Sequence, residues 1–287
     1  MNAVEVKNLT KYYRGFTLDH ISFSLPGGCI MGLIGENGAG KSTIIKLLLG
    51  IIRKDEGSIS LFGRGESGRQ HLLKDEVGFV LDELKLNCEF RAKNINNIMS
   101  SAYRHWNSET FYGLLDKMNI PVSKRIKAMS RGMKMKVGIA IAMSHNAKLL
   151  ILDEATGGLD PVVRDEVVDM LYEFTRDEEH SVLISSHIVS DLEKLCDYIA
   201  FLHHGKLVLC EEKDRLMEQY GMIHCTEKQL SELDCSAVIG KKSNQYGAEA
   251  IVRRDAVPKG LDIGPTDIEK LFVFMNRGNH NEEYDKK

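Results

Sequence analysis

A glycine-rich segment near the start of the chain has the residue types and spacing that bind phosphate. Residues 35–42 read GENGAGKS, which fits the pattern G-x-x-x-x-G-K-[ST] between an apolar run and a helix-favouring stretch. Glycines allow positive φ and close backbone approach, so successive N–H groups can surround phosphate oxygens at a helix N-terminus. Lys41 can reach the β- and γ-phosphates and Ser42 can bind Mg²⁺, whereas the alternative, a glycine turn that binds nothing, is disfavoured by this context. The predicted nucleotide-binding residues of the loop are Gly35, Glu36, Asn37, Gly38, Ala39, Gly40, Lys41, Ser42 and Thr43.

A second segment places two carboxylates after a fully apolar run. Residues 149–152 read LLIL and are followed by Asp153 and Glu154. Ligands bind at the C-terminal ends of strands in open α/β sheets, so both acids are candidates for chemistry. Asp153 would hold Mg²⁺, directly or through water, and Glu154 would orient and polarise an attacking water. The alternative is that the two acids only cap the next segment, which the phosphate loop in the same chain disfavours.

The elements that must position these residues alternate between strands and helices. The first 65 residues indicate short strands and one helix, residues 87–130 are helical in pattern, and from residue 148 strands and helices alternate again. This order predicts an α/β fold with a largely parallel sheet and helices on its faces.

Capping residues predict where several helices begin. Ser108 and Ser130 are candidate N-caps, and Asp160 followed by proline is a typical helix start. Residues 266–269 read TDIE, a capping box before a further helix. The polar residues Asn279–Lys287 are expected to be disordered.

Composition excludes several classes of protein. The 287 residues carry a formal net charge of −3, so there is no general basic field and no nucleic-acid partner is expected. No apolar run approaches the roughly 20 residues that cross a bilayer, and the charged N-terminus lacks a signal-peptide core. The six cysteines form no C-x-x-C pair or zinc spacing, which favours reduced cysteines in a cytosolic protein.

Three further motifs occur in a fixed order around the two carboxylates. Residues 129–133 read MSRGM, residues 157–161 read GGLDP and residues 185–187 read SSH. Together with the phosphate loop, this set resembles the ATPases of ATP-binding cassette (ABC) transporters over residues 3–215. The resemblance implies a P-loop NTPase ABC ATPase fold: a mixed sheet with an antiparallel N-terminal β part and a helical subdomain. It places the ATPase domain at residues 1–215, with the helical subdomain at about 87–146, and leaves an α/β appendage with a disordered tail at 216–287.

The same resemblance assigns roles to residues at matching positions. Ser130 and Gly132 match the signature motif, which closes on the γ-phosphate bound by a partner subunit. Asp160 matches the loop that links the two sites of the dimer. His187 matches the switch histidine and, with Glu154 and Lys41, would form the catalytic set. Tyr13 matches the aromatic residue that stacks on adenine, although the adjacent Tyr12 and a plain packing role are alternatives.

Three departures from the family pattern stand out. The signature reads MSRGM rather than LSGGQ, a variant found in the branch of drug- and bacteriocin-type exporters. Ala155 replaces a common proline. Asp82 stands where the family has a glutamine, and its carboxylate is a candidate Mg²⁺ ligand, with a solvated loop acid as the alternative.

The resemblance implies the ATP-hydrolysing subunit of an exporter. Two such subunits, identical or related, would sandwich ATP and Mg²⁺ and power a separate integral membrane permease. The subunit would be cytoplasmic and reach the cell membrane through that permease. The alternatives are a soluble ABC ATPase and an ATP-binding regulatory scaffold, neither of them coupled to transport.

Overall fold

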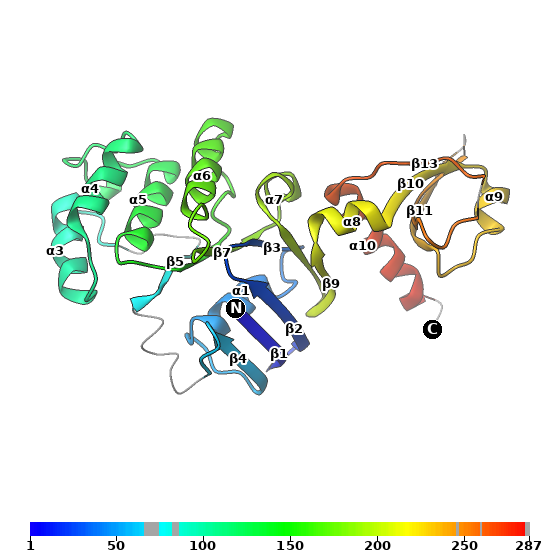
Figure 1. The fold of residues 1–287 in the computed structure, drawn as a ribbon, viewed down its shortest axis with the longest axis horizontal. Coiled ribbons are helices and arrows are strands. Elements are labelled where there is room, and N and C mark those ends of the chain that lie inside the picture. Colours follow the sequence, from blue (N-terminus) through cyan, green and yellow to red (C-terminus); the bar gives the residue numbers. More distant parts are fainter. Residues whose placement is uncertain (66–74, 82–85, 245–246, 259, 285–287) are drawn as a thin grey trace. The chain divides into compact units, whose positions relative to one another are not determined.

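The computed structural model describes the chain apart from residues 66–74, 82–85, 245–246, 259 and 285–287 (Figure 1). Asp82, the metal candidate from the sequence, lies outside the described residues. The chain divides into two compact units, Met1–Cys210 and Glu211–Lys287. The predicted site residues that the structure describes all belong to the first unit.

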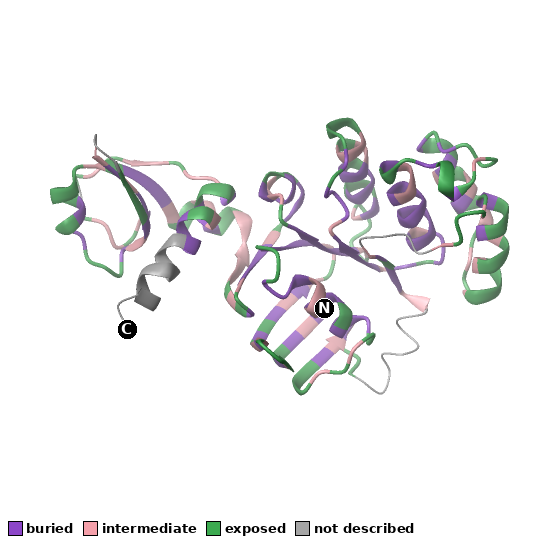
Figure 2. Ribbon diagram, turned by 180° about the vertical axis from the view of Figure 1, so that it is seen from behind, coloured by how far each residue is buried: buried purple, intermediate pink, exposed green. Residues whose placement is uncertain are grey.

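A six-stranded sheet forms the centre of the first unit, in the order β5-β6-β7-β3-β8-β9. Its strands are β3 (Ile30–Gly35), β5 (Val77–Val80), β6 (Leu149–Asp153), β7 (Ser181–Ser186), β8 (Tyr198–His203) and β9 (Lys206–Glu212). The pairs from β5 to β8 are parallel, as predicted. Every residue of β3, β6 and β7 is buried, because elements pack on both faces of the sheet (Figure 2).

One face of this sheet packs against a second, antiparallel sheet and one helix. The elements are β1 (Asn2–Tyr13), β2 (Phe16–Pro26), β4 (Glu56–Leu61) and α1 (Lys41–Leu48). The three strands pair in the order β2-β1-β4. Alternate residues of the central strands, Met31, Leu33, Leu149, Ile151 and Leu183, share one apolar cluster with these elements. The period of two along each strand therefore selects the side chains that face this layer.

Helices α5 (Arg131–Met143), α6 (Pro161–Phe174) and α7 (Val189–Leu195) lie on the other side of the central sheet (Figure 1). Two glycines allow the close packing. A Cβ at Gly78 would lie 2.3 Å from the carbonyl oxygen of Ala142 in α5. A Cβ at Gly32 would lie 2.9 Å from Sγ of Cys196, which ends α7. Any larger residue at these positions would push the helices away from the sheet.

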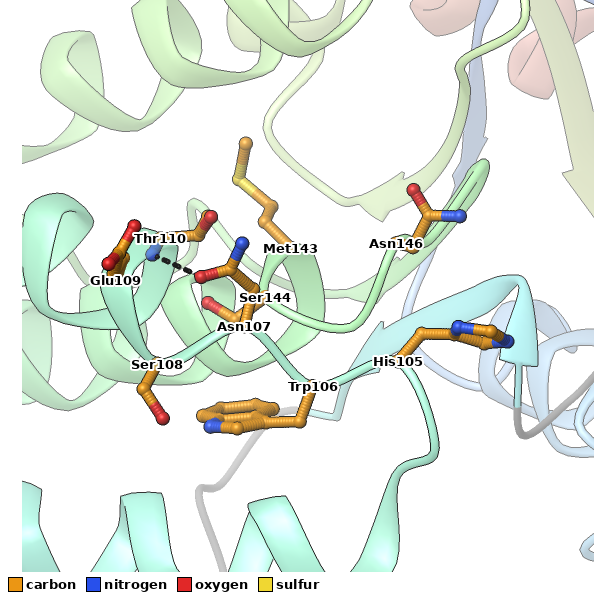
Figure 3. Close-up of a pocket in the computed structure, with 9 residues that line it drawn as sticks. All are labelled: His105, Trp106, Asn107, Ser108, Glu109, Thr110, Met143, Ser144 and Asn146. Atoms are coloured by element: carbon orange, nitrogen blue, oxygen red, sulfur yellow. Dashed lines mark hydrogen bonds between the residues drawn. The ribbon is translucent and has the colours of Figure 1, made fainter.

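The helical segment consists of α3 (Ala92–Ala102), α4 (Ser108–Lys117), a 3-10 turn (Ile126–Ala128) and α5. The predicted cap of α4 is wrong by one residue. The N-cap is Asn107, whose Oδ1 accepts a hydrogen bond from the backbone N–H of Thr110 at 3.0 Å (Figure 3). Asn107 has extended backbone and an equally good acceptor, so the helix begins at Ser108. The predicted caps of α5 and α6 are confirmed, with Ser130 accepting from Met133 and Asp160 from Val163.

The second unit contains a four-stranded antiparallel sheet in the order β11-β12-β10-β13. Its elements are α8 (Lys213–Gln219), β10 (Tyr220–Cys225), α9 (Glu227–Ser231), β11 (Val238–Asn244), β12 (Gly247–Arg253), β13 (Ile263–Gly264) and α10 (Ile268–Tyr284). The cap before α10 is Asp267, which accepts from the N–H of Lys270 at 2.6 Å, rather than the predicted Thr266. The tail expected to be disordered from Asn279 to Lys287 continues α10 as far as Tyr284, in a stretch without a proline that would end the helix, and residues 285–287 lie outside the described residues.

Candidate functional site

The phosphate loop connects the C-terminal end of β3 to the N-terminus of α1. Gly38 and Gly40 have φ of +86° and +113°, a region that side chains of other residues rarely adopt. Gly40 is the N-cap of α1, and as a glycine it places no side chain in front of the first N–H groups of the helix. These N–H groups and the helix dipole can therefore bind an anion.

Lys41 curls back over this loop. Its Nζ donates to the carbonyl oxygens of Gly35 at 2.7 Å and Glu36 at 3.3 Å, and it lies 3.4 Å from Oε1 of Glu154. The Lys41 side chain is only 5% exposed, so its charge needs these partners. The ammonium thus joins the phosphate loop to the acid that follows β6.

Asp153 lies at the end of β6 and contacts hydroxyl groups from two other elements. Its Oδ1 accepts from Ser42 Oγ at 3.1 Å and from Ser185 Oγ at 2.6 Å. Two oxygen ligands at about 2.1 Å on neighbouring corners of an octahedral ion lie about 3 Å apart, so Ser42 and Asp153 fit Mg²⁺. The described residues contain no group of three or more His, Cys, Asp or Glu that could hold a metal. The remaining oxygens would have to come from nucleotide and water, which is usual for Mg²⁺.

Glu154 connects the carboxylate strand to β7 and to His187. Its backbone N–H lies 3.2 Å from the carbonyl oxygen and 3.0 Å from Oγ of Ser185. Its φ of +53° is uncommon for a residue other than glycine, and such backbone strain concentrates at functional sites. Oε2 of Glu154 lies 2.6 Å from Nδ1 of His187. The Glu154 carboxylate therefore contacts both Lys41 and His187, the two other residues predicted to be catalytic.

Four residues of this site, Lys41, Ser42, Glu154 and His187, border a cavity of about 780 Å³. Its lining residues are Phe16, Glu36, Asn37, Gly38, Gly40, Lys41, Ser42, Thr43, Arg131, Glu154, Gly157, Gly158 and His187. The parallel order β6-β7-β3 brings the ends of the three motif-bearing strands together, and this adjacency builds the site. The hollow drawn in Figure 3, about 650 Å³ between residues 105–110 and 143–146, holds none of the predicted site residues.

Several residues in or beside the cavity have no role assigned from the sequence. Ser185 belongs to the SSH motif, in which only His187 is given a role, yet it contacts both Asp153 and Glu154. Arg131 lies within the signature motif, where glycine is usual in the family, and Phe16 directly follows a glycine turn. The sequence signal for Arg131 is its departure from the family pattern, and the signal for Ser185 is its place in the SSH motif, two residues before His187.

The two tyrosines near the cavity differ in their contacts. The Tyr12 hydroxyl donates to Glu56 at 2.9 Å. The Tyr13 ring lies 6.4 Å from that of Phe16, which borders the cavity, and is 44% exposed. Tyr13 is therefore next to the cavity wall, whereas Tyr12 is bound to the neighbouring β4 strand.

Three predicted site residues, two from the signature motif and one from the loop at Asp160, lie outside the lining of the cavity, although Arg131 of the signature belongs to it. The described residues that line the cavity do not include Ser130, Gly132 or Asp160. Ser130 and Asp160 are exposed and cap α5 and α6. A Cβ at Gly132 would lie 2.8 Å from Cγ1 of Val163, so this glycine permits close packing of the two helices.

Comparison with known proteins identifies the family. A model of the ABC transporter family matches residues 18–157. The lantibiotic transport ATP-binding protein SrtF of Streptococcus pyogenes is 39% identical over 214 residues, which is 74% of this chain and 91% of that protein. This chain belongs to the ABC transporter family. As a member, it is an ATPase that binds ATP. The bacitracin transport ATP-binding protein BcrA of Enterococcus faecalis is also similar to this ABC subunit, at 31% identity over 82% of this chain and 75% of that protein.

Solved structures confirm the predicted ABC ATPase fold. An ATP-binding subunit of an ABC transporter matches with a TM-score of 0.68 and 27% identity, over 76% of this chain and 92% of that one. A dimeric post-hydrolysis ATP-binding cassette bound to ADP and Pi matches in fold with a TM-score of 0.66 at 20% identity, over 73% and 98% of the two chains. Among the described residues of this ABC subunit, no helix combines the length and apolar character needed to span a bilayer.

Proposed function

We propose that this ABC subunit hydrolyses ATP to drive export through a separate membrane permease. The similar proteins from Streptococcus pyogenes and Enterococcus faecalis are named for transport of a lantibiotic and of bacitracin, and one from Sinorhizobium fredii, 32% identical over 72% of this chain and 62% of that protein, for export of Nod factor. Peptide antibiotics are therefore the substrate class to test first. The subunit works in the cytoplasm and reaches the membrane through its permease.

The observation that carries this proposal is the contact of the Glu154 carboxylate with both Lys41 and His187 beside the phosphate loop. In hydrolysis, water attacks the γ-phosphoryl group, and the protein contributes position and charge. Glu154 orients the water and accepts its proton, Lys41 neutralises phosphate oxygens, and His187 stabilises the charge that develops. Ser42 and Asp153 hold Mg²⁺, which supplies further neutralisation of the phosphates when bound.

A second subunit, identical or related, completes each site. Ser130 and Asp160 are exposed and lie outside the cavity of their own subunit, so they are accessible to a partner. In the dimer, Ser130 and Gly132 of one subunit would approach the γ-phosphate held by the other, and Asp160 would link the two sites. Tyr13 would stack on the adenine ring. The ATPase domain would occupy residues 1–215 and the appendage residues 216–287.

Co-purification with candidate membrane permeases, beginning with any that a neighbouring gene encodes, tests the proposal. We expect ATPase activity of the complex to rise when its transported compound is added, with peptide antibiotics tried first. The complex carrying Glu154→Gln should show no stimulation. Glu179→Gln is a matched control, because Glu179 is a surface acid, 70% exposed, that pairs only with Lys148 among the described residues. Failure to co-purify with any permease, with unstimulated turnover, would contradict the transport role.

A further inference from the structure

An ion pair connects the helix after the Asp160 loop to the helix after His187. Nη1 of Arg164 in α6 lies 3.4 Å from Oδ1 of Asp191 in α7. The Asp191 side chain is 7% exposed and that of Arg164 is 28% exposed. A second nitrogen of the same guanidinium, Nη2, donates to the carbonyl oxygen of Leu159 at 3.3 Å. Arg164 therefore contacts both the loop before Asp160 and the helix that begins just beyond His187.

Both ends of this connection lead to the catalytic residues. Asp191 lies in the first turn of α7, which begins two residues after His187. Leu159 belongs to the loop that starts at Glu154, and a Cβ at Gly157 in this loop would lie 3.6 Å from Cε1 of His187. The guanidinium thus bridges the two segments that leave β6 and β7 on the side of the nucleotide cavity.

The pair is only half formed in this structure. Nε of Arg164 and Oδ2 of Asp191 are both buried, and neither has a hydrogen-bond partner among the described residues. The Nε–H and one Nη2–H of a guanidinium can donate parallel bonds to the two oxygens of one carboxylate, so a rotation that turns this edge of Arg164 toward Asp191 would satisfy both atoms. A cavity of about 510 Å³ borders both residues, which leaves space for the side chains to rearrange. Because unpaired buried polar atoms are unfavourable, the structure favours any movement that completes the second bond.

We propose that Arg164 and Asp191 are positioning residues for ATP hydrolysis. Their pair holds the loop of residues 157–160 in a fixed position relative to His187. The inference rests on the proposed role of His187. It differs from a plain stabilising contact between α6 and α7, because the pair controls the geometry of the site rather than only the stability of the helices.

Three variants of the full chain test the proposal: Arg164→Met, Asp191→Asn and the double variant. Each single variant should lower kcat by roughly 10- to 100-fold, the effect of displacing a catalytic group by about 1 Å, while the Kd for ATP changes less than about twofold. The double variant removes both charges and leaves no lone buried charge, so its Tm should be higher than that of the less stable single variant. Its kcat should stay as low as that of the worse single variant, because the two residues act as one unit.

Two controls separate the possible outcomes. Asp191→Glu keeps the charge with a longer reach and should retain much of the turnover, and Asp165→Asn, an exposed neighbour on α6, should change nothing. Unchanged kcat in all three pair variants, losses that multiply in the double variant, or a kcat that recovers together with Tm would overturn the proposal. Turnover of Glu154→Gln and His187→Ala distinguishes failure of the proposed function from failure of this inference. Parental turnover in both variants would refute the catalytic site itself. Loss of turnover in both, with parental turnover in the pair variants, would refute only the positioning role of Arg164 and Asp191.

Discussion

Replacement of Ser185 by alanine should lower the free energy of unfolding of the first unit and raise the Mg²⁺ concentration that its ATPase activity requires. The buried Ser185 hydroxyl donates to the carboxylate of Asp153 at 2.6 Å and accepts from the N–H of Glu154 at 3.0 Å. A hydrogen bond to a charged group contributes about 1.5–3 kcal/mol and one between neutral groups about 0.5–1.5 kcal/mol. The N–H of Glu154 keeps the Ser185 carbonyl oxygen as a partner at 3.2 Å, so the expected loss is about 2–3 kcal/mol in the free energy of unfolding.

The functional effect should be larger than the loss of stability suggests. Among the described residues, Asp153 would remain bound to Ser42 alone, at 3.1 Å, so its carboxylate could rotate away from the metal position. Residues that orient a metal ligand typically change metal affinity by 10- to 100-fold. We expect Ser185→Ala to raise the Mg²⁺ concentration for half-maximal ATPase activity by at least about tenfold. Urea unfolding and Mg²⁺ titration of ATPase activity measure the two effects.

Ser181→Ala is the matched control. Ser181 lies at the other end of the same strand, is equally buried, and its Oγ accepts one bond from the N–H of Gly28 at 3.0 Å. Its replacement should reduce the free energy of unfolding by about 1 kcal/mol and leave the Mg²⁺ dependence unchanged. Equal effects of the two variants on stability and on Mg²⁺ would refute the reasoning, because Ser185 would then be an ordinary buried serine.

Three further changes have definite expected outcomes. Glu154→Gln should bind ATP but not hydrolyse it, so a dimer should accumulate with ATP in size-exclusion chromatography; a monomer with parental turnover would contradict the assignment. Tyr13→Ala should weaken ATP binding roughly 5- to 100-fold, since base stacking on an aromatic ring contributes about 1–3 kcal/mol, and Tyr12→Ala should do much less in the same titration. Burial lowers the pKa of His145, although hydrogen bonds to backbone carbonyls oppose the shift. The unfolded chain therefore takes up a proton at higher pH than the folded one, so the stabilisation is complete above the unfolded pKa of about 6.5 and declines as pH falls below it. The drop in Tm between pH 8 and pH 5.5 should consequently be smaller in His145→Gln than in the parental chain, and an equal drop would show that another group dominates.

The sequence predicts helix starts and buried strands well, because residues close together in the chain determine both. Ser130 and Asp160 cap the helices as expected, because each precedes a helical stretch with extended backbone and a short acceptor side chain. The cap of α4 was misplaced because Asn107 and Ser108 are adjacent residues of similar capping ability. Apolar runs such as residues 149–152 become buried parallel strands, and their order in the sheet brings the motifs to one edge.

What the sequence could not predict depends on pairing between distant segments. Ser185 reaches Asp153 and Glu154 only because β6 and β7 pair with Asp153 opposite Ser185, and no local pattern encodes this register. The place of Phe16 in the cavity wall likewise depends on how β2 passes the phosphate loop. The ion pair of Arg164 and Asp191 joins two helices 27 positions apart in sequence, and each residue alone resembles an ordinary helix charge.

The position of Lys41 makes the nucleotide a competitor for a contact that the protein already has. Its ammonium contacts the carbonyl oxygens of Gly35 and Glu36 and the carboxylate of Glu154, so a γ-phosphate that binds Lys41 must compete with these contacts. ATP affinity is therefore a difference between two sets of contacts and not the strength of one. Replacing the Glu154 carboxylate by an amide weakens its contact with Lys41. Glu154→Gln should therefore bind ATP more tightly, and this effect is separate from the block in hydrolysis. An ATP-bound dimer of Glu154→Gln would therefore accumulate for two reasons: ATP is hydrolysed slowly, and Lys41 no longer pairs with a carboxylate at position 154.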